Sequence, residues 1–339
     1  MKRQLLGVAA FMLALSAHAQ DNPLWMRYCA ISPDGTSIAF TYKGDIYTVP
    51  VNGGKAAQIT TNAAHDTHPV WSPDGKQIAF ASDRMGSMDI FVVDREGGIP
   101  KRLTTHSGNE TPVAFKDADH ILFLANVMPS AEDAQFPSGQ FQQVYEVSTT
   151  GDRPVMFSSM PMEDISINKT GNALLYHDKK GYEDPWRKHH TSSITRDIWL
   201  CSLDGKRSYR KLTSFNGEDR TPVWASDGKS FYYLSEEKGS FNVFKRALDG
   251  TSSTQLTHHT KHPVRFLTAA DNGTLCYGYD GEIYTIKEGT EPRKVQISIL
   301  TDKNDKDLIR QIRRKVRQKY ALLSDAKEVS HILRGDCLR

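Results

Sequence analysis

Cysteine is scarce in this sequence, which has four cysteines among 339 residues and no C-x-x-C pair. Four scattered cysteines are too few for the disulfide framework that holds small exported domains together. Zinc sites made of cysteine need closely spaced pairs, so this spacing also argues against metal binding by these residues. The fold must therefore rest on a packed core.

Catalytic signatures are also missing, since the chain has no G-x-S-x-G nucleophile elbow and no H-E-x-x-H helix. Adjacent histidines on a strand point to opposite faces, which favours solvated loop histidines over a metal site. The histidines in question are His65, His68, His189, His190, His258, His259 and His262. We therefore expect no catalytic residue, no cofactor and no metal in this chain.

Excess charge and long apolar runs are lacking as well. The formal net charge is +3, and Lys2 and Arg3 contribute two of these charges, so no broad field favours nucleic acid. The apolar run at residues 5–15 is shorter than the roughly 20 residues of a membrane-spanning helix. An A-x-A cleavage pattern follows it, as in secretory signal peptides. We expect residues 1–19 to be removed and the mature protein to be periplasmic, without a membrane span.

What the sequence does contain is a repeat. Six copies of one pattern follow each other at intervals of about 40 residues, which is typical of propellers. The first two read YCAISPDGTSIAFTYKGDIYTVPVNGGKAAQIT and PVWSPDGKQIAFASDRMGSMDIFVVDREGGIPKRLT. The others begin with PVAFKDADHILF, EDISINKTGNALLYH, PVWASDGKSFYY and PVRFLTAADNGTL. Each copy has four short strands separated by turns, with no convincing helix between them.

The repeat predicts an all-β fold, a six-bladed β-propeller with four antiparallel strands per blade, over residues 20–300. In the Ser-Pro-Asp-Gly turn, proline fixes φ near about −65° and glycine supplies a positive φ. In the strand that follows, Ile78 and Phe80 alternate with Ala79 and Ala81. This alternation is expected for a sheet packed on both faces between neighbouring blades.

In such a ring the first and last blades meet. Cys29 and Cys276 would lie in neighbouring or end-meeting blades. A disulfide between these two residues is therefore kept as an alternative to free cysteines. Residues 24–27 are the candidate strand for closing the ring against the last blade. The tail, residues 301–339, is predicted to be an irregular linker followed by a seventh repeat that ends before its third strand.

A four-stranded meander places successive loops at alternate ends of the blade. The SPDG turns and the later glycine turns therefore share one face of the ring. The links between blades share the other face with two insertions, ANVMPSAEDAQFPSGQFQQ and HDKKGYEDPWRKHHTSSITRD. We expect the SPDG turns to be scaffold and any function to lie on the opposite face.

These repeats also resemble those of a known family. WSPDGKQIAFASDRMGSMDIFVVD resembles the WD40-like repeats shared by TolB-type periplasmic proteins and tricorn-type serine peptidases. LWMRYCAISPDGTSIAFTYKGDIYTVPVNGG and YEDPWRKHHTSSITRDIWL look more like the exported bacterial tricorn-type peptidases. The similarity covers approximately residues 21–299.

In that family an N-terminal six-bladed propeller is followed by a second propeller, a PDZ module and a catalytic domain with the serine nucleophile. None of these later parts is found in this sequence, so no catalytic residue is carried over. The resemblance implies that the chain is a fragment of a longer peptidase.

Two groups of residues are candidates for binding a peptide or a partner domain. The first group lies at or near the starts of the inner strands. The alternative to ligand binding is a structural role, in which these residues hold the links between blades in place. This group consists of His68, Glu110, Asp219, Arg220 and His262. The second group lies in the fourth-blade insertion and consists of Trp186, Arg187, His189 and His190. Trp and Arg often anchor interfaces, which favours binding of a partner by this group. The alternative is structural, because the nearby Arg196 and Asp197 can hold the insertion against its own blade.

The sequence thus favours a non-catalytic propeller that admits peptides or unfolded protein to a serine peptidase, or docks onto its other domains. The missing catalytic, PDZ and second propeller domains would be its partners. The alternative is a stand-alone TolB-like periplasmic propeller that binds one protein partner. A sugar-binding propeller is a third class, for which the links lack an obvious aromatic platform.

Overall fold

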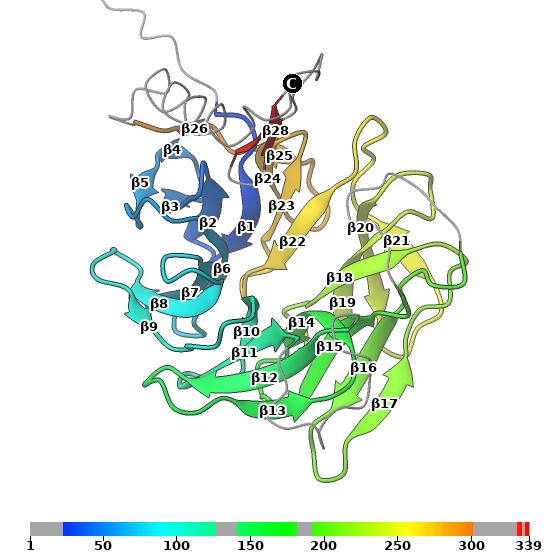
Figure 1. The fold of residues 1–339 in the computed structure, drawn as a ribbon. Helices are drawn as coiled ribbons and strands as arrows, with labels where there is room; N and C mark the ends of the chain where they lie inside the picture. The colour runs from blue at the N-terminus through cyan, green and yellow to red at the C-terminus, as the bar shows by residue number, and fades with distance from the viewer. Residues whose placement is uncertain (1–22, 127–140, 182–191, 301–330, 334–335, 339) are drawn as a thin grey trace, which may run out of the picture.

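The computed structural model describes residues 23–126, 141–181, 192–300, 331–333 and 336–338. Every regular element within these ranges is a strand (Figure 1). A membrane-spanning helix is therefore absent from the described part of the chain.

Six four-stranded antiparallel sheets follow one another around a ring in chain order (Figure 1). This confirms the predicted six-bladed, all-β propeller. Blades one to three consist of β1 (Arg27–Ile31), β2 (Ser37–Tyr42), β3 (Asp45–Pro50) and β5 (Ala57–Gln58); β6 (Asp66–Trp71), β7 (Gln77–Ser82), β8 (Asp89–Asp94) and β9 (Lys101–Arg102); and β10 (Glu110–Phe115), β11 (His120–Ala125), β12 (Gln143–Ser148) and β13 (Val155–Ser158). Blades four to six consist of β14 (Met162–Ile167), β15 (Ala173–Asp178), β16 (Ile198–Ser202) and β17 (Ser208–Lys211); β18 (Asp219–Trp224), β19 (Ser230–Ser235), β20 (Asn242–Ala247) and β21 (Ser253–Gln255); and β22 (Arg265–Ala269), β23 (Leu275–Tyr279), β24 (Glu282–Ile286) and β25 (Arg293–Lys294).

The SPDG motif shapes the turn between the first two strands of a blade. In blade one, Asp34 accepts hydrogen bonds from the Ser32 hydroxyl at 2.5 Å and from the Thr36 amide at 2.9 Å. Gly35 has a φ of 72°, and a Cβ placed there would lie 2.3 Å from the Asn272 side chain of blade six. The motif therefore serves its own turn and the contact with a neighbouring turn, which fits the scaffold role predicted for it.

The threonine near the end of several repeats also has a structural reason. Its hydroxyl accepts a hydrogen bond at 2.9–3.0 Å from the backbone N–H of a residue in the third strand of the same blade. The pairs are Thr60 with Ile46, Thr104 with Ile90, Thr213 with Ile198, and Thr257 with Val243. This contact holds the start of the third strand against the chain that leaves the blade.

The hydrophobic core lies between the blades. Six buried clusters each join two neighbouring blades, and together they complete the circle. Ile78 and Phe80 of β7 pack toward blade one, whereas Ala79 packs toward blade three. The predicted packing of this strand on both faces is thereby confirmed, and each blade depends on its neighbours for a core.

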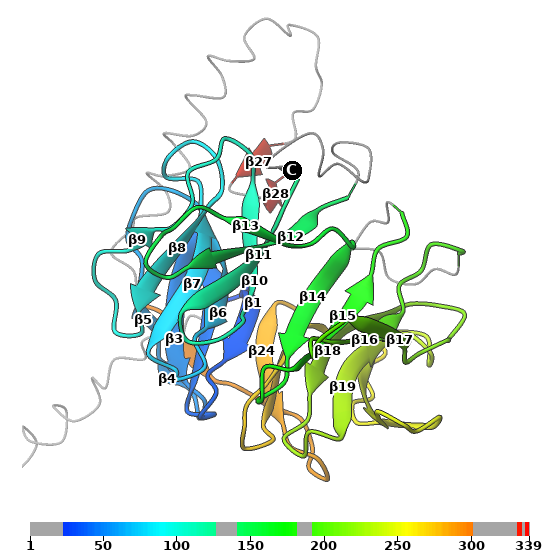
Figure 2. The ribbon, with the colours of Figure 1, turned by 90° about the horizontal axis from the view of Figure 1, so that it is seen from below.

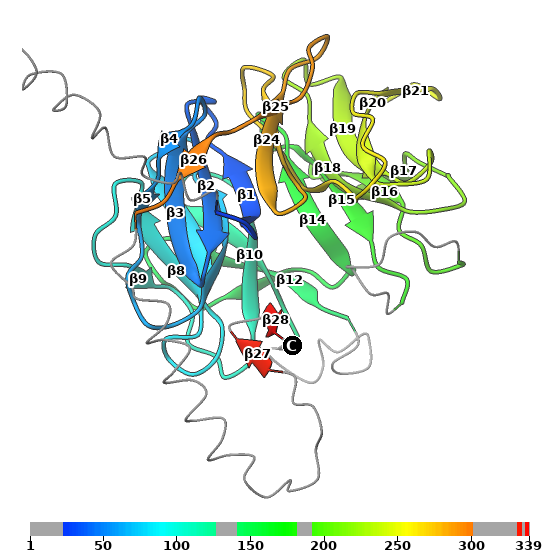
Figure 3. The same cartoon turned by 90° about the horizontal axis from the view of Figure 1, so that it is seen from above.

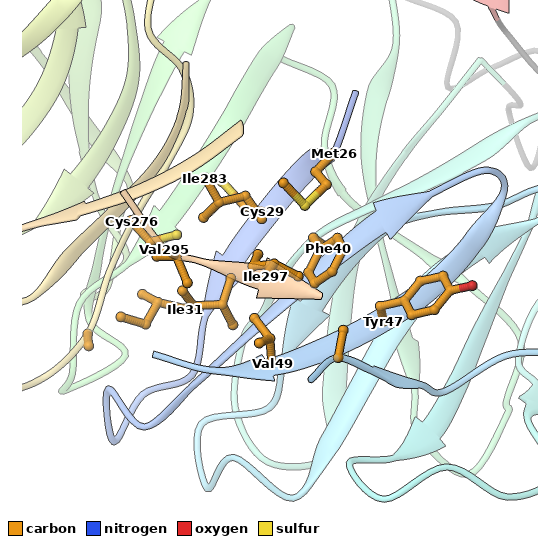
Figure 4. Close-up of a cluster of buried hydrophobic side chains, with 13 residues drawn as sticks. Met26, Cys29, Ile31, Phe40, Tyr47, Val49, Cys276, Ile283, Val295 and Ile297 are labelled. Atoms are coloured by element: carbon orange, nitrogen blue, oxygen red, sulfur yellow. The ribbon is translucent and has the colours of Figure 1, made fainter. Parts of the chain in front are cut away.

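The ring is closed at both ends of the propeller sequence. The Met26 amide donates to the Gly281 carbonyl of blade six at 3.0 Å, so the chain contacts the last blade where this was expected, but residues 23–26 do not form the predicted closing strand. A second closure comes from β26 (Ile297–Ser298), which pairs in parallel with β4 (Gly54–Lys55) beside blade one (Figure 3). Cys29 and Cys276 lie in the cluster between the two blades (Figure 4), and both are free thiols.

A short hairpin follows near the C-terminus, formed by β27 (His331–Leu333) and β28 (Asp336–Leu338) (Figure 2). Leu333 pairs with Asp336 as Tyr42 pairs with Asp45 in blade one. The matching register is that of the second and third strands of a blade. Three residues, Asp336–Leu338, therefore pair where no third strand was expected, and the predicted further repeat stays a prediction.

Candidate functional site

A cavity of about 1060 Å³ lies on the axis of the ring, and the innermost strands of all six blades line it. Its wall runs from turn residues such as Pro33 to residues near the links, among them His68 and Arg220. At the turn end, Nζ of Lys169 in blade four lies 3.1 Å from Oδ2 of Asp271 in blade six. An ion pair between blades that are not neighbours therefore crosses this end of the cavity.

Each innermost strand contributes an equivalent residue to the wall of the cavity, close to the strand's first residue. We call these six residues the collar, and they are Tyr28, His68, Pro112, Asp164, Thr221 and Phe266. In five blades the collar residue has a left-handed backbone with φ between 48° and 59°. The pairing register shifts beside it in each of those blades. Pro112 is the exception in its backbone angle, because its ring excludes a positive φ, although the register shifts beside it too.

The collar carries backbone strain. A left-handed conformation costs a residue other than glycine about 1–2 kcal/mol, and it is especially unfavourable for a β-branched residue such as Thr221. A bulge re-aims the side chain that it carries. Strain of this kind persists only where the surrounding structure imposes it, and it clusters at functional sites. The collar is therefore the best candidate for a functional site among the described residues.

The collar has an aromatic arc and a polar arc. In the aromatic arc, the ring of Tyr28 lies 4.8 Å from that of Phe266 and 3.7 Å from that of His68, measured between centroids. Burial lowers the pKa of His68 to about 4, so this imidazole is neutral at pH 7. In the polar arc, the Thr221 hydroxyl donates to Asp164 at 2.6 Å. The channel thus contains the aromatic platform that the links lack.

A buried charge network lies behind the polar arc. Arg196, only 5% exposed, lies 3.3 Å from Glu163 of its own blade and 2.7 Å from Glu218 at blade five. Burial would raise the pKa of Glu163, but a hydrogen bond with His177 and the charges of Arg196 and Lys179 hold it well below its usual range. Arg196 therefore joins blades four and five, in addition to any role beside the insertion.

Two of the predicted binding residues reach the cavity, namely His68 and Arg220. Arg220 also donates a hydrogen bond to the buried Glu218, and its guanidinium lies 5.0 Å from the centre of the Phe241 ring. The two residues come from blades two and five. They therefore share the cavity without forming a contact pair.

The other predicted residues lie elsewhere. Glu110 and Asp219 are each 2% exposed, at the starts of β10 and β18. Glu110 accepts a hydrogen bond from Thr104 of the preceding blade. His262 lies in a link, with Nε2 3.3 Å from Asp280, and is not part of the cavity wall. Trp186, Arg187, His189 and His190 lie outside the described residues.

The pH dependence of stability tests whether Glu110, at the link between blades two and three, is buried as the structure shows. Burial raises its pKa to about 7 from an ordinary value of 4.5. The folded state therefore holds the proton more tightly than the unfolded state, and this group's contribution to stability is lost as pH rises from about 4.5 to 7. We expect the Glu110→Gln variant to gain about 2–3 kcal/mol in free energy of unfolding relative to wild type between pH 4.5 and 8.

Urea denaturation of both proteins across this pH range measures the difference. Glu96→Gln is the control, because the Glu96 side chain is 88% exposed and its variant should follow wild type at every pH. Parallel curves for Glu110→Gln and wild type would show that Glu110 titrates normally.

Sequence reasoning missed five of the six collar residues, Tyr28, Pro112, Asp164, Thr221 and Phe266. Their common signal is position, since each is the residue equivalent to His68 in its own repeat. Their side chains share no chemical type, so a search for ligand-like residues does not select them. The sign of φ that re-aims all of them but Pro112 is not visible in the sequence.

Comparison with known proteins agrees with the geometry. Residues 23–292 match the model of the Tricorn protease N-terminal beta propeller domain. "Tricorn protease homolog 1" of Streptomyces coelicolor is 25% identical over 279 residues, which are 82% of this chain and 25% of that protein. The chain thus spans about a quarter of the length of this relative.

Two solved structures show the same fold. A crystal structure of the tricorn protease superimposes with a TM-score of 0.70 at 20% identity, covering 83% of this chain and 27% of that one. TolB from Acinetobacter baumannii gives a TM-score of 0.56 at 16% identity, covering 77% of this chain and 60% of that one. Because the family model matches most of the residues that form the six blades, the chain belongs to the family of tricorn protease N-terminal β-propeller domains.

Proposed function

We propose that this propeller admits peptides through its axial cavity to a serine peptidase centre outside the described residues. The observation that supports the proposal is the cavity of about 1060 Å³ whose wall is drawn from all six blades. Its wall mixes apolar, aromatic and charged groups, a combination that suits extended peptides of varied sequence. The name tricorn protease, carried by the relatives, points to proteolysis as the context.

Peptide binding to the full chain tests this proposal. Fluorescein-labelled peptides of ten residues with randomised sequence are titrated with the protein, and fluorescence anisotropy reports binding. The Thr111→Trp variant narrows the cavity, because Thr111 is part of its wall. We expect this variant to bind at least tenfold more weakly than wild type.

The matched control is Ile99→Trp, which adds the same ring at a residue that is 97% exposed and outside the cavity wall. This variant should bind like wild type. Equal weakening in both variants, or none in Thr111→Trp, would place peptide binding outside the channel. A single tight protein partner without peptide binding would favour the stand-alone propeller instead.

We further propose that the protein is exported and cleaved after Ala19. The support is the N-terminal sequence, in which two cations, an apolar run and an A-x-A pattern follow one another. Intact mass measurement of the protein from cells should find a chain that begins at Gln20. A chain that keeps residues 1–19 and stays with the cytosolic fraction would contradict export.

A further inference from the structure

The channel contains a carboxylate that no lysine or arginine of the described residues contacts directly, although Arg196 also lines the cavity and interacts with it electrostatically. Asp164 of the collar lines the cavity, and its side chain is 47% exposed. It accepts a hydrogen bond from the Thr221 hydroxyl at 2.6 Å. Among the described residues, no lysine or arginine lies within 4.0 Å of it, and its ion-pair neighbour is Nδ1 of His177 at 3.6 Å.

His177 lies closer to Glu163 than to Asp164. Its Nδ1 accepts a hydrogen bond from the Thr221 amide at 3.3 Å. Its Nε2 lies 3.2 Å from Glu163, whereas Nδ1 lies 3.6 Å from Asp164. Asp164 thus keeps an exposed part of its side chain in the cavity that it lines.

The aromatic arc faces this carboxylate across the axis. Burial lowers the pKa of His68, and the charge of Asp164 opposes that shift, so the two groups are within electrostatic range. Burial also raises the pKa of Tyr28, and Asp164 adds to that rise. A cation at this level of the channel would lie between a carboxylate and the aromatic arc. Both contacts favour positive charge.

We propose that the collar binds the positively charged group of a peptide, holding it between the Asp164 carboxylate and the ring of Tyr28. This inference rests on the proposed function, because it names the feature by which the channel recognises its peptides. The group is the amino terminus or a basic side chain, which share this chemistry. Arg265 also lines the cavity and acts electrostatically on Tyr28, so it opposes the binding of a cation.

Three octapeptides with a C-terminal fluorescein distinguish the sources of the charge. The first has a free amino terminus and no basic residue, the second is its acetylated form, and the third is acetylated and carries one lysine. Anisotropy titrations with the full chain should show at least tenfold tighter binding of a charged peptide than of the acetylated neutral one. Tighter binding of the first peptide identifies the amino terminus as the group that the collar binds. Tighter binding of the third identifies the lysine side chain.

Two variants connect this preference to the collar. Asp164→Asn keeps an acceptor for Thr221 and removes the charge, so it should abolish the tenfold preference for a charged peptide over the neutral one. Arg265→Gln should increase the preference. The control is Asp271→Asn, which removes a carboxylate from the turn end of the same cavity, where Lys169 pairs with it, and should keep the preference.

The outcomes separate the two proposals. If the neutral peptide binds as tightly as the charged ones, the channel still admits peptides but the collar does not select charge, and this inference fails. If no peptide binds, the proposed function fails with it. If Asp271→Asn removes the preference and Asp164→Asn does not, the cation binds at the turn end and the collar is excluded.

Discussion

Replacing Ile297 by aspartate is expected to open the ring and to lower the free energy of unfolding by about 4 kcal/mol or more. Ile297 is 3% exposed and belongs to the cluster between the first and last blades (Figure 4). A carboxylate in this position has no cation to pair with in the apolar cluster. The free energy needed to bury this carboxylate would exceed the stabilisation from the contacts that close the ring. The pairing of β26 with β4 should therefore break.

Urea denaturation followed by tryptophan fluorescence measures the loss. Leu300→Asp is the matched control, since it places the same charge three residues further along at a side chain that is 67% exposed. That variant should unfold within about 0.5 kcal/mol of wild type. If the two variants unfold at the same urea concentration, the ring does not depend on β26.

Replacing Arg196 by methionine should lower the free energy of unfolding by about 3–5 kcal/mol. The guanidinium is buried between two carboxylates, Glu163 and Glu218, at the junction of blades four and five. Removing it leaves both acids near each other without their shared cation. The variant tests whether this network holds the two blades together.

A rescue experiment separates charge from shape. The triple variant Arg196→Met, Glu163→Gln, Glu218→Gln should recover part of the loss. It removes the repulsion between the two acids, while Lys179 and Arg220 lose their carboxylate partners. Lys169→Met is the surface control, since its side chain is 84% exposed and its ion pair with Asp271 should contribute less than about 1 kcal/mol. A triple variant that is no more stable than Arg196→Met would mean that the arginine acts through its packing.

The blades could be predicted because their signals are local. The alternation of Ile78 and Phe80 with Ala79 lies within one strand, and the SPDG turns fix the start of that strand. The closing strand β26 could not be predicted, since it is a pair of residues, Ile297 and Ser298, with no periodic pattern. Its pairing depends on where the ring brings the last blade, which is a property of the whole fold.

The candidate site was predicted in part, and the expectation that function lies opposite the SPDG turns stays a prediction. The sequence placed function away from the SPDG turns and selected His68 and Arg220, which reach the axial cavity. It did not select Asp164 or Tyr28, because a bulge that reverses the sign of φ re-aims both side chains. Glu110 looked like a ligand by residue type, but it is buried outside the cavity wall and accepts a hydrogen bond from Thr104.

The pairing of β4 with β26 also sets an order of events during synthesis. Gly54 and Ser298, which meet through this pairing, are 244 positions apart in the chain. At a translation rate of about 5–20 residues per second, β4 leaves the ribosome roughly 12 to 50 s before its partner. During that interval β4, which lies beside blade one, has no strand to pair with. The ring can therefore close through this pairing only after the last blade has been synthesised.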